Sequence, residues 1–168
     1  MTALEPIRYE PDRAFPPYAY LPGRDPHPTR DPAGHMHGVP EPEVTAPAPD
    51  DYHGCSDYLF GVDLYNHGYH WEAHEVWEGL WHASTDTIQR EMLQALIQAA
   101  AAGVQFRLGN AHGRARLAWR AAERLRRVER EFGLDYMGIH VSQLATDLAR
   151  FAFEERDLPG IFVRMPRD

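Results

Sequence analysis

Residues 86–108, DTIQREMLQALIQAAAAGVQFRL, decide the fold class of this chain. Apolar side chains recur there every three or four residues, which predicts an amphipathic helix with one buried stripe. That stripe consists of Leu93, Ile97, Ala100, Val104 and Leu108. Thr85 or Asp86 precedes it and can cap the first turn by accepting a hydrogen bond from a free backbone N–H.

The same spacing continues on both sides of this stretch, and no proline interrupts it between Asp57 and Pro159. Four further helices are expected at residues 56–66, 69–83, 111–131 and 141–155. Glycines stand where three of the expected helices end: Gly68, Gly109 and Gly133. Asn110 is placed to cap the fourth helix, and no segment alternates well enough to predict a strand. The sequence therefore predicts an all-α fold, an irregular bundle of four to five helices.

The N-terminal part has a different composition, because 12 of the 14 prolines lie within residues 1–50. Proline fixes φ and removes a backbone donor, so no regular helix or central strand is expected there. The segment is nevertheless rich in aromatic side chains, unlike most disordered tails. We expect an extended proline-rich N-terminal arm and linker at 1–50, packed on a single helical domain at 51–168. Residues 41–51 are expected to be a flexible linker.

Composition excludes several kinds of chemistry. The chain has 17 arginines and no lysine, so it can form no lysine Schiff base and has no phosphate-loop lysine. Its single cysteine, Cys55, excludes an internal disulfide and a four-thiolate zinc site. The first ten residues lack the apolar core of a signal peptide, and no apolar run is long enough to span a membrane. These features predict a cytoplasmic protein.

Charge is unevenly distributed along the chain, whose net charge is −8. This acidity makes nucleic acid an improbable partner. The expected helix at 111–131 nevertheless carries seven arginines, and we interpret it as a solvated face that pairs with acidic residues. A phosphate-binding surface is the alternative, for which Trp119 is the one aromatic residue in that helix.

The densest chemistry lies in residues 69–82, YHWEAHEVWEGLWH. At about 100° per residue, five side chains of this expected helix share one face: His70, Trp77, His74, Trp81 and Glu78. Residues four apart are neighbours on a helix, so His74 and Glu78 can chelate one ion. Glu75 points away from that face and is a candidate partner of a metal ligand or a candidate general base, whereas Glu72 is expected to be solvated or to act as a helix cap.

Burial of His74 and Glu78 beside an apolar face requires partners for both side chains. A metal ion, a polar network and a direct hydrogen bond between the two all satisfy that requirement. Three glutamines form a row on the next helix: Gln94, Gln98 and Gln105. The row either faces inward and orients His74 and Glu78 by hydrogen bonds, or forms a solvated polar edge.

These residues resemble a known family, the bacterial and archaeal proteins grouped as domain of unknown function 309. The resemblance lies in LYNHGY (64–69), WEAHEVWEGLW (71–81), LQALIQ (93–98) and RLGN (107–110), and includes the pattern His-x-x-x-Glu-x-x-Trp. It implies a small multihelical fold and a metal-binding role for His74, Glu78 and Trp81, without an established reaction. The family pattern also implies an aromatic residue in place of His70 and a histidine in place of Gln105.

Two functional hypotheses follow. In the first, the protein binds zinc, iron or manganese through His74 and Glu78, with His70 completing or bordering the site, Trp77 beside them, and His27 or His35 of the arm closing the pocket. It would then be a metal-dependent hydrolase or another small enzyme, acting on a small molecule, with Glu75 as the base.

In the second hypothesis, the chain is a non-catalytic binding module whose His, Glu and Gln side chains form a structural network. Arg24, Arg30 and Asp31 would then attach the arm to the body, and the partner would be a protein. Exposed tryptophans, such as Trp71 or Trp119, are compatible with a homo-oligomer.

Overall fold

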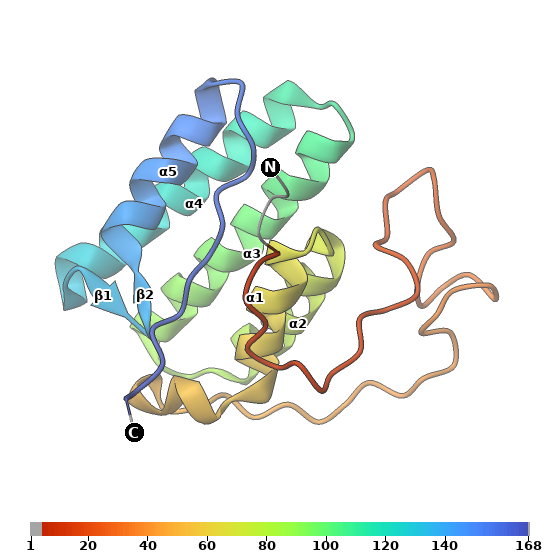
Figure 1. Cartoon of the computed structure of the whole chain (residues 1–168), viewed down its shortest axis with the longest axis horizontal. Coiled ribbons are helices and arrows are strands. Elements are labelled where there is room, and N and C mark those ends of the chain that lie inside the picture. Colours follow the sequence, from red (N-terminus) through yellow and green to blue (C-terminus); the bar gives the residue numbers. More distant parts are fainter. Residues whose placement is uncertain (1–4, 168) are drawn as a thin grey trace.

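The computed structural model describes residues 5–167, and the five expected helices are present in it. Their bounds are α1 Ser56–Asn66, α2 His70–Ala83, α3 Thr87–Arg107, α4 Ala111–Phe132 and α5 Val141–Phe153. Consecutive helices pack against each other, so that α3 lies between α2 and α4, and α5 covers the far side of α4 (Figure 1). The fold is therefore mostly helical, as expected from the spacing of apolar residues.

The helix ends follow the signals in the sequence. The Asp86 carboxylate accepts a hydrogen bond from the Gln89 N–H at 2.7 Å, and the Asn110 side chain accepts one from the Gly113 N–H at 3.0 Å. These are the expected caps of α3 and α4. Gly68 and Gly109, which end α1 and α3, have φ values of +87° and +71°, a conformation that glycine adopts without strain.

Trp77 of α2 lies at the centre of the core and is fully buried. Its indole N–H donates to the Tyr58 carbonyl of α1 at 3.3 Å. The indole ring lies directly against Gly61, so α1 leaves no space for a Cβ atom at that position. The close approach of α1 and α2 therefore depends on this glycine.

A short hairpin between α4 and α5 contradicts the expectation that the chain has no strand. Its antiparallel strands are β1 (Asp135–Tyr136) and β2 (Ile139–His140). Met137 and Gly138 join them with φ values of +46° and +76°, as in a type I′ turn. Strands of two residues are too short to show an alternating pattern, which is why the sequence did not reveal them.

The N-terminal arm is attached to the body by buried hydrogen bonds. The Asp63 carboxylate of α1, which is fully buried, accepts hydrogen bonds from the N–H groups of Tyr9 and Glu10, both at 2.8 Å, and from Arg8 Nε at 3.1 Å. The expected anchors do not serve this purpose. Arg24 pairs with the adjacent Asp25, and the Asp31 side chain accepts from an N–H two residues away.

Residues 41–51 also contact the body. Val44 packs against the core beside Gly79 of α2, and the Pro47 carbonyl accepts a hydrogen bond from the Gln89 side chain at 2.8 Å. A 3-10 helix, Pro49–Gly54, then leads into α1. The segment that we expected to be a flexible linker therefore has defined contacts with α2 and α3.

The C-terminal segment crosses the bundle as an extended strap, residues 158–164 (Figure 1). Asn66 brackets Ile161, because its side chain donates to the Ile161 carbonyl at 2.7 Å and accepts from the Ile161 N–H at 2.8 Å. The Val163 N–H donates to the Tyr9 hydroxyl of the arm. Ile161 and Val163 are buried, so the strap completes the core.

Within residues 5–167, no helix combines the length and the apolar character that crossing a membrane requires.

Candidate functional site

The exposure of α2 changes gradually around the helix. Ala73, Trp77 and Leu80 face the core and are fully buried. The His74 side chain is 29% exposed and that of Glu78 41% exposed, so both lie at the edge of the buried face. This position leaves their polar atoms open to a solute, while the helix that carries them is fixed by the core.

Three side chains of α2 bring donor atoms together at this edge. His74 Nδ1 lies 3.2 Å from Glu75 Oε1 and 3.8 Å from Glu78 Oε2. One donor atom from each of the three side chains lies within 4.8 Å of the others. An imidazole with two carboxylates is a donor set that fits zinc, iron or manganese.

Glu75 belongs to this group, although the helical angles predicted that it points away. Its Oε1 atom lies 3.2 Å from His74 Nδ1 because the long side chain spans the angle between adjacent residues. On the other side, His82 Nε2 lies 3.9 Å from Glu78 Oε1, and the His82 side chain is mostly exposed. The structure therefore gives three clustered donors and a fourth titratable group beside them.

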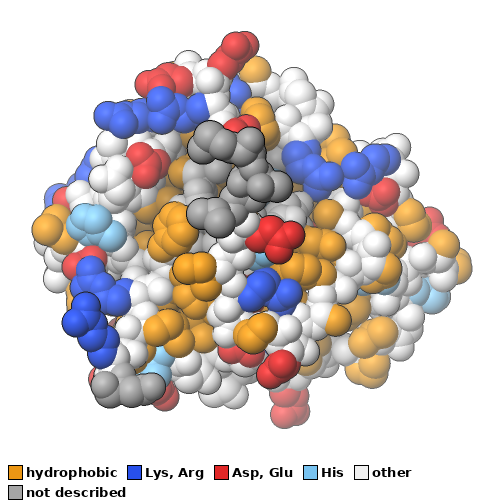
Figure 2. All heavy atoms as spheres, in the orientation of Figure 1, with side chains coloured by type: hydrophobic (Ala, Val, Ile, Leu, Met, Phe, Trp, Pro, Cys, Tyr) orange, Lys and Arg blue, Asp and Glu red, His pale blue; other side chains and the backbone are white. Residues whose placement is uncertain are grey.

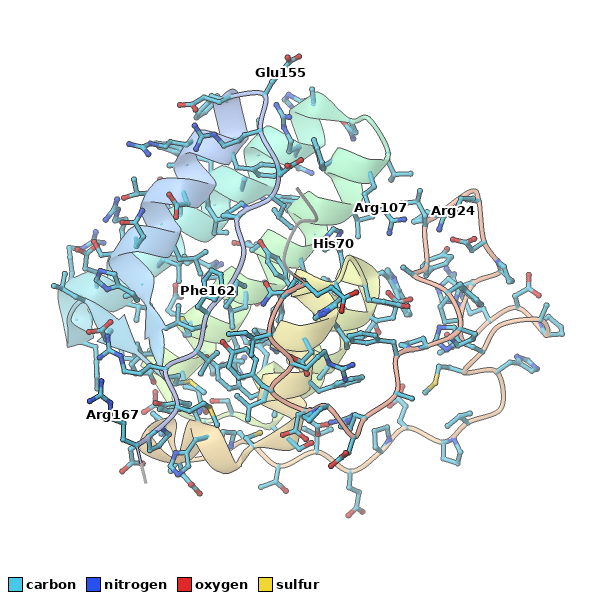
Figure 3. All side chains as sticks on the ribbon, in the orientation of Figure 1. Arg24, His70, Arg107, Glu155, Phe162 and Arg167 are labelled. Carbon is cyan, nitrogen blue, oxygen red and sulfur yellow. The ribbon has the colours of Figure 1, made fainter. Side chains whose placement is uncertain are left out.

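His70, which we expected to extend the donor set, is outside it. Its ring is buried against Gly103 of α3 and packs edge-on against Tyr65. Burial and the nearby Arg107 guanidinium lower the pKa of His70 to about 4, so the imidazole is neutral at physiological pH. The Nδ1 atom has no hydrogen-bond partner among the described residues. Figure 3 shows Arg107, from the end of α3, beside His70 and the arm residue Arg24.

The two tryptophans of the motif have structural contacts. Trp77 lies in the core, as described above. Trp81 is half-buried and stacks under the Arg90 guanidinium, whose carbon lies 4.1 Å from the ring centroid. Arg90 also donates to the Trp81 carbonyl at 2.6 Å, which closes the end of α2 onto α3.

The glutamines of α3 have partners other than His74. Gln98 accepts a hydrogen bond from Arg124 of α4, and Gln105 accepts one from the Asn110 side chain at the α3–α4 turn. The described residues show no hydrogen bond from the Gln94 side chain. The contacts of Gln98 and Gln105 thus stabilise the packing of α3 on α4.

The arm covers a second polar position on α2, which the sequence did not reveal. Of the two alternatives for Glu72, the solvated one is wrong, because its side chain is buried and accepts the Tyr20 N–H at 2.7 Å. His35 Nε2 lies 3.9 Å from the same carboxylate. Burial raises the pKa of Glu72 and lowers the pKa of His35. His35 therefore faces Glu72, and the His74 group is composed of α2 residues alone.

Aromatic side chains surround this contact. Tyr20 and His27 of the arm pack edge-on against Trp71, with ring centroids 5.1 Å and 5.6 Å away. The aromatic composition of the arm was the signal for this packing. That signal did not show which residue of the body the arm would cover.

The segment that contains α1, α2 and α3 matches a known family model. Residues 58–117 match the family model described as Domain of unknown function (DUF309). The resemblance expected from the sequence is therefore confirmed over this segment, which runs from α1 into the first turns of α4. Neither the curated proteins nor the solved structures gave a match.

All three clustered donors lie inside the DUF309 segment, whereas the arm, the hairpin, α5 and the strap lie outside it. Within the matched segment, α1 and α3 pack against α2, which carries the donor group.

Proposed function

We propose that this protein binds a divalent transition metal ion through His74, Glu75 and Glu78, and that the bound ion serves a hydrolytic reaction on a small molecule. The observation that carries the proposal is the convergence of three donor atoms within 4.8 Å on one helix. Like-charged carboxylates close to each other repel unless a cation or a hydrogen-bond donor lies between them.

The donor set also suits an open site. Three protein ligands leave coordination positions for water and substrate, which is the arrangement of catalytic rather than structural zinc sites. When bound, such an ion polarises a substrate carbonyl or phosphoryl oxygen and lowers the pKa of a bound water. The partial exposure of His74 and Glu78 gives a small molecule direct access to these positions.

His82 supports this proposal from outside the group. Its imidazole lies 3.9 Å from the second oxygen of the Glu78 carboxylate. An imidazole that hydrogen-bonds a ligand carboxylate orients it, and mutation of such outer partners lowers metal affinity by about 10- to 100-fold in characterised sites.

Metal content gives the first test. The full chain, purified without a metal-affinity tag, is incubated with zinc, iron(II) or manganese(II), desalted and examined by elemental analysis. We expect about one equivalent of metal, and His74→Ala should reduce it to below about 0.1, because ligand loss removes most of the binding energy. His112→Ala, in an exposed position on α4, is the matched control and should retain the wild-type content. A wild-type chain that retains no metal from any of the three salts would disprove the proposal.

Glu75→Gln distinguishes a ligand from a base. If Glu75 is a ligand, as the geometry indicates, the variant should bind metal at least about tenfold more weakly, because an amide is a poorer ligand than a carboxylate. Unchanged affinity with loss of a hydrolytic activity would instead assign Glu75 the role of general base. Isothermal titration calorimetry with the metal alone measures the affinity without knowledge of the substrate.

A further inference from the structure

An open surface groove lies between α4 and α5. These two helices are on the side of the molecule opposite the arm (Figure 1). The volume of the groove is about 440 Å³, within the range of small-molecule sites. Alanines form the floor of the groove: Ala122 from α4, and Ala145 and Ala149 from α5. Because these side chains are small, they leave a hollow between the two helices, and larger side chains line its rim.

The rim residues of α4 follow a defined order. Trp119 is at one end, Glu123 one turn further along, and Arg126, Arg127 and Arg130 at the other end. With a rise of 1.5 Å per residue, Glu123 is about 6 Å from Trp119 along the helix axis, and Arg127 is about 6 Å further on. An aromatic ring, an acidic acceptor and a group of guanidinium ions therefore follow each other in one line.

The aromatic end of the groove is open to solvent. Trp119 is 45% exposed, and Phe153 of α5, which is 71% exposed, lies 5.7 Å from it between ring centroids. Two large aromatic side chains exposed together form an apolar surface on which a planar ring can stack.

The arginine end holds three guanidinium groups: Arg126 has several partners, Arg127 has one, and Arg130 has none among residues 5–167. Arg126 donates to Thr146 at 2.7 Å, to Ser142 at 3.3 Å and to Glu129 at 2.8 Å, so its position is set by α5. Among residues 5–167, no side chain forms an ion pair or hydrogen bond with Arg130.

Arg127 has one distant contact, 3.5 Å from Glu91, which Arg124 binds more closely at 2.9 Å. Ser142 and Thr146 belong to the first turns of α5, where the positive end of the helix dipole also favours an anion. Figure 2 shows basic side chains in separate groups on this face of the molecule, with acidic side chains among them.

We propose that the α4–α5 groove binds a nucleoside polyphosphate. The base stacks on Trp119 and Phe153, the ribose hydroxyls donate to the Glu123 carboxylate, and the phosphates contact Arg127 and Arg130 beside Arg126. In dinucleotide-binding folds a carboxylate accepts a hydrogen bond from a ribose hydroxyl. Arginine binds phosphate oxygens with two parallel hydrogen bonds, which suits a chain that contains no lysine.

A small nucleotide fits this groove better than a nucleic-acid strand does. Glu123 places a negative charge in the middle of the groove, where a continuous polyanion would have a phosphate nearby. The net charge of −8 repels a long polyanion as well. One ribose with free hydroxyls can use the carboxylate as an acceptor.

The test uses the full chain without added metal, which keeps it independent of the proposed metal centre. Isothermal titration calorimetry with ATP should give a Kd below about 1 mM, a binding free energy of roughly −4 kcal/mol or stronger. Adenosine and tripolyphosphate should each bind at least about tenfold more weakly than ATP, because each lacks one half of the contacts.

Three variants and a matched control assign the contacts. Arg130→Gln and Trp119→Leu should each weaken ATP binding by about tenfold, the usual effect of losing a charge-assisted hydrogen bond or a stacking contact. Glu123→Gln should weaken binding of ATP but not of tripolyphosphate. Arg116→Gln, exposed on the same helix but outside the groove, should change the affinity by less than about twofold. All four positions are on the surface, and thermal melts check that each variant is folded.

Four results would overturn the proposal. These are no heat of binding with ATP at millimolar concentration, equal affinities for ATP and tripolyphosphate, an equal loss in Arg116→Gln and Arg130→Gln, and tighter binding of a single-stranded oligonucleotide than of ATP.

Discussion

His70 and His74 are one helical turn apart, yet they lie in opposite environments. The His70 ring is buried against Gly103, while the His74 side chain is partly exposed beside two carboxylates. A buried imidazole without a hydrogen-bond partner for Nδ1 favours its neutral form. The same residue type therefore serves core packing at one position and is available for ligand binding at the other.

The low pKa of His70 makes stability depend on pH. Because its folded pKa of about 4 is below the unfolded value of 6.5, its contribution is fully present above pH 6.5 and is lost as the pH falls towards 4. The difference corresponds to about 3 kcal/mol. His70→Phe keeps a ring on Gly103 and should flatten the decline in unfolding free energy between pH 6.5 and 4, measured by urea denaturation. His112→Phe, at an exposed position, should leave the slope unchanged, and parallel curves for wild type and His70→Phe would contradict this role.

At the scale of the helices, α1 and α2 approach closely because glycine faces tryptophan. Gly61 lies directly against the Trp77 indole, whereas Gly79, on the outer side of α2, would place a Cβ atom in ordinary contact with Val44 at 3.5 Å. The two glycines thus differ in the space around them. The close packing of α1 against α2 at Gly61 fixes the position of α2, which carries the donor group.

Substitution by alanine should separate these two glycines. Gly61→Ala forces a Cβ atom into the Trp77 ring and should lower the free energy of unfolding by about 3 kcal/mol. Gly79→Ala should raise it by up to about 1 kcal/mol, because alanine has less conformational entropy to lose in a helix. Chemical denaturation monitored by circular dichroism measures both, and equal effects of the two substitutions would exclude this account of α1–α2 packing.

At the scale of the whole molecule, the arm and the strap unite parts of the chain that are distant in sequence. The Asp63 carboxylate of α1 accepts hydrogen bonds from the N–H groups of Tyr9 and Glu10. The Tyr9 hydroxyl in turn accepts one from the Val163 N–H. One buried carboxylate therefore supports both the arm and, through Tyr9, the strap.

Removal of this carboxylate should release the arm. Asp63→Ala leaves Arg8 and two backbone N–H groups without their acceptor, so we expect a loss of about 3 kcal/mol and faster cleavage within residues 5–20 in limited proteolysis. Asp57→Ala removes a more exposed partner of Arg13 and should cost less than about 1 kcal/mol. Identical cleavage rates in both variants would show that Asp63 does not anchor the arm.

Local patterns predicted the local features of this fold. The spacing of apolar residues gave the helices, and Asp86 and Asn110 act as the caps that their positions indicated. Contacts between distant segments could not be derived in this way. The burial of Glu72 depends on Tyr20, which is 52 residues away, and the separation of His70 from the donor group depends on Gly103.

The donor group illustrates the same limit at closer range. His74 and Glu78 follow directly from the four-residue spacing, and the structure places them 3.8 Å apart. Glu75 joins them through the reach of its side chain, which the direction of its Cβ alone does not show. Helical angles therefore identify neighbours reliably only where the side chains are short or the residues share a face.

The strap has a consequence for the order of folding. Five of its hydrogen bonds join residues that are 94 to 154 positions apart, whereas the helix pairs form between neighbours in the chain. Contacts that close such long loops form late, because closing the loop lowers the conformational entropy of the chain before the contact stabilises the fold. The strap should therefore dock after the bundle has assembled. By the same argument it should detach first, and the amide of Ile161 should then exchange its hydrogen earlier than the amides in the middle of α3.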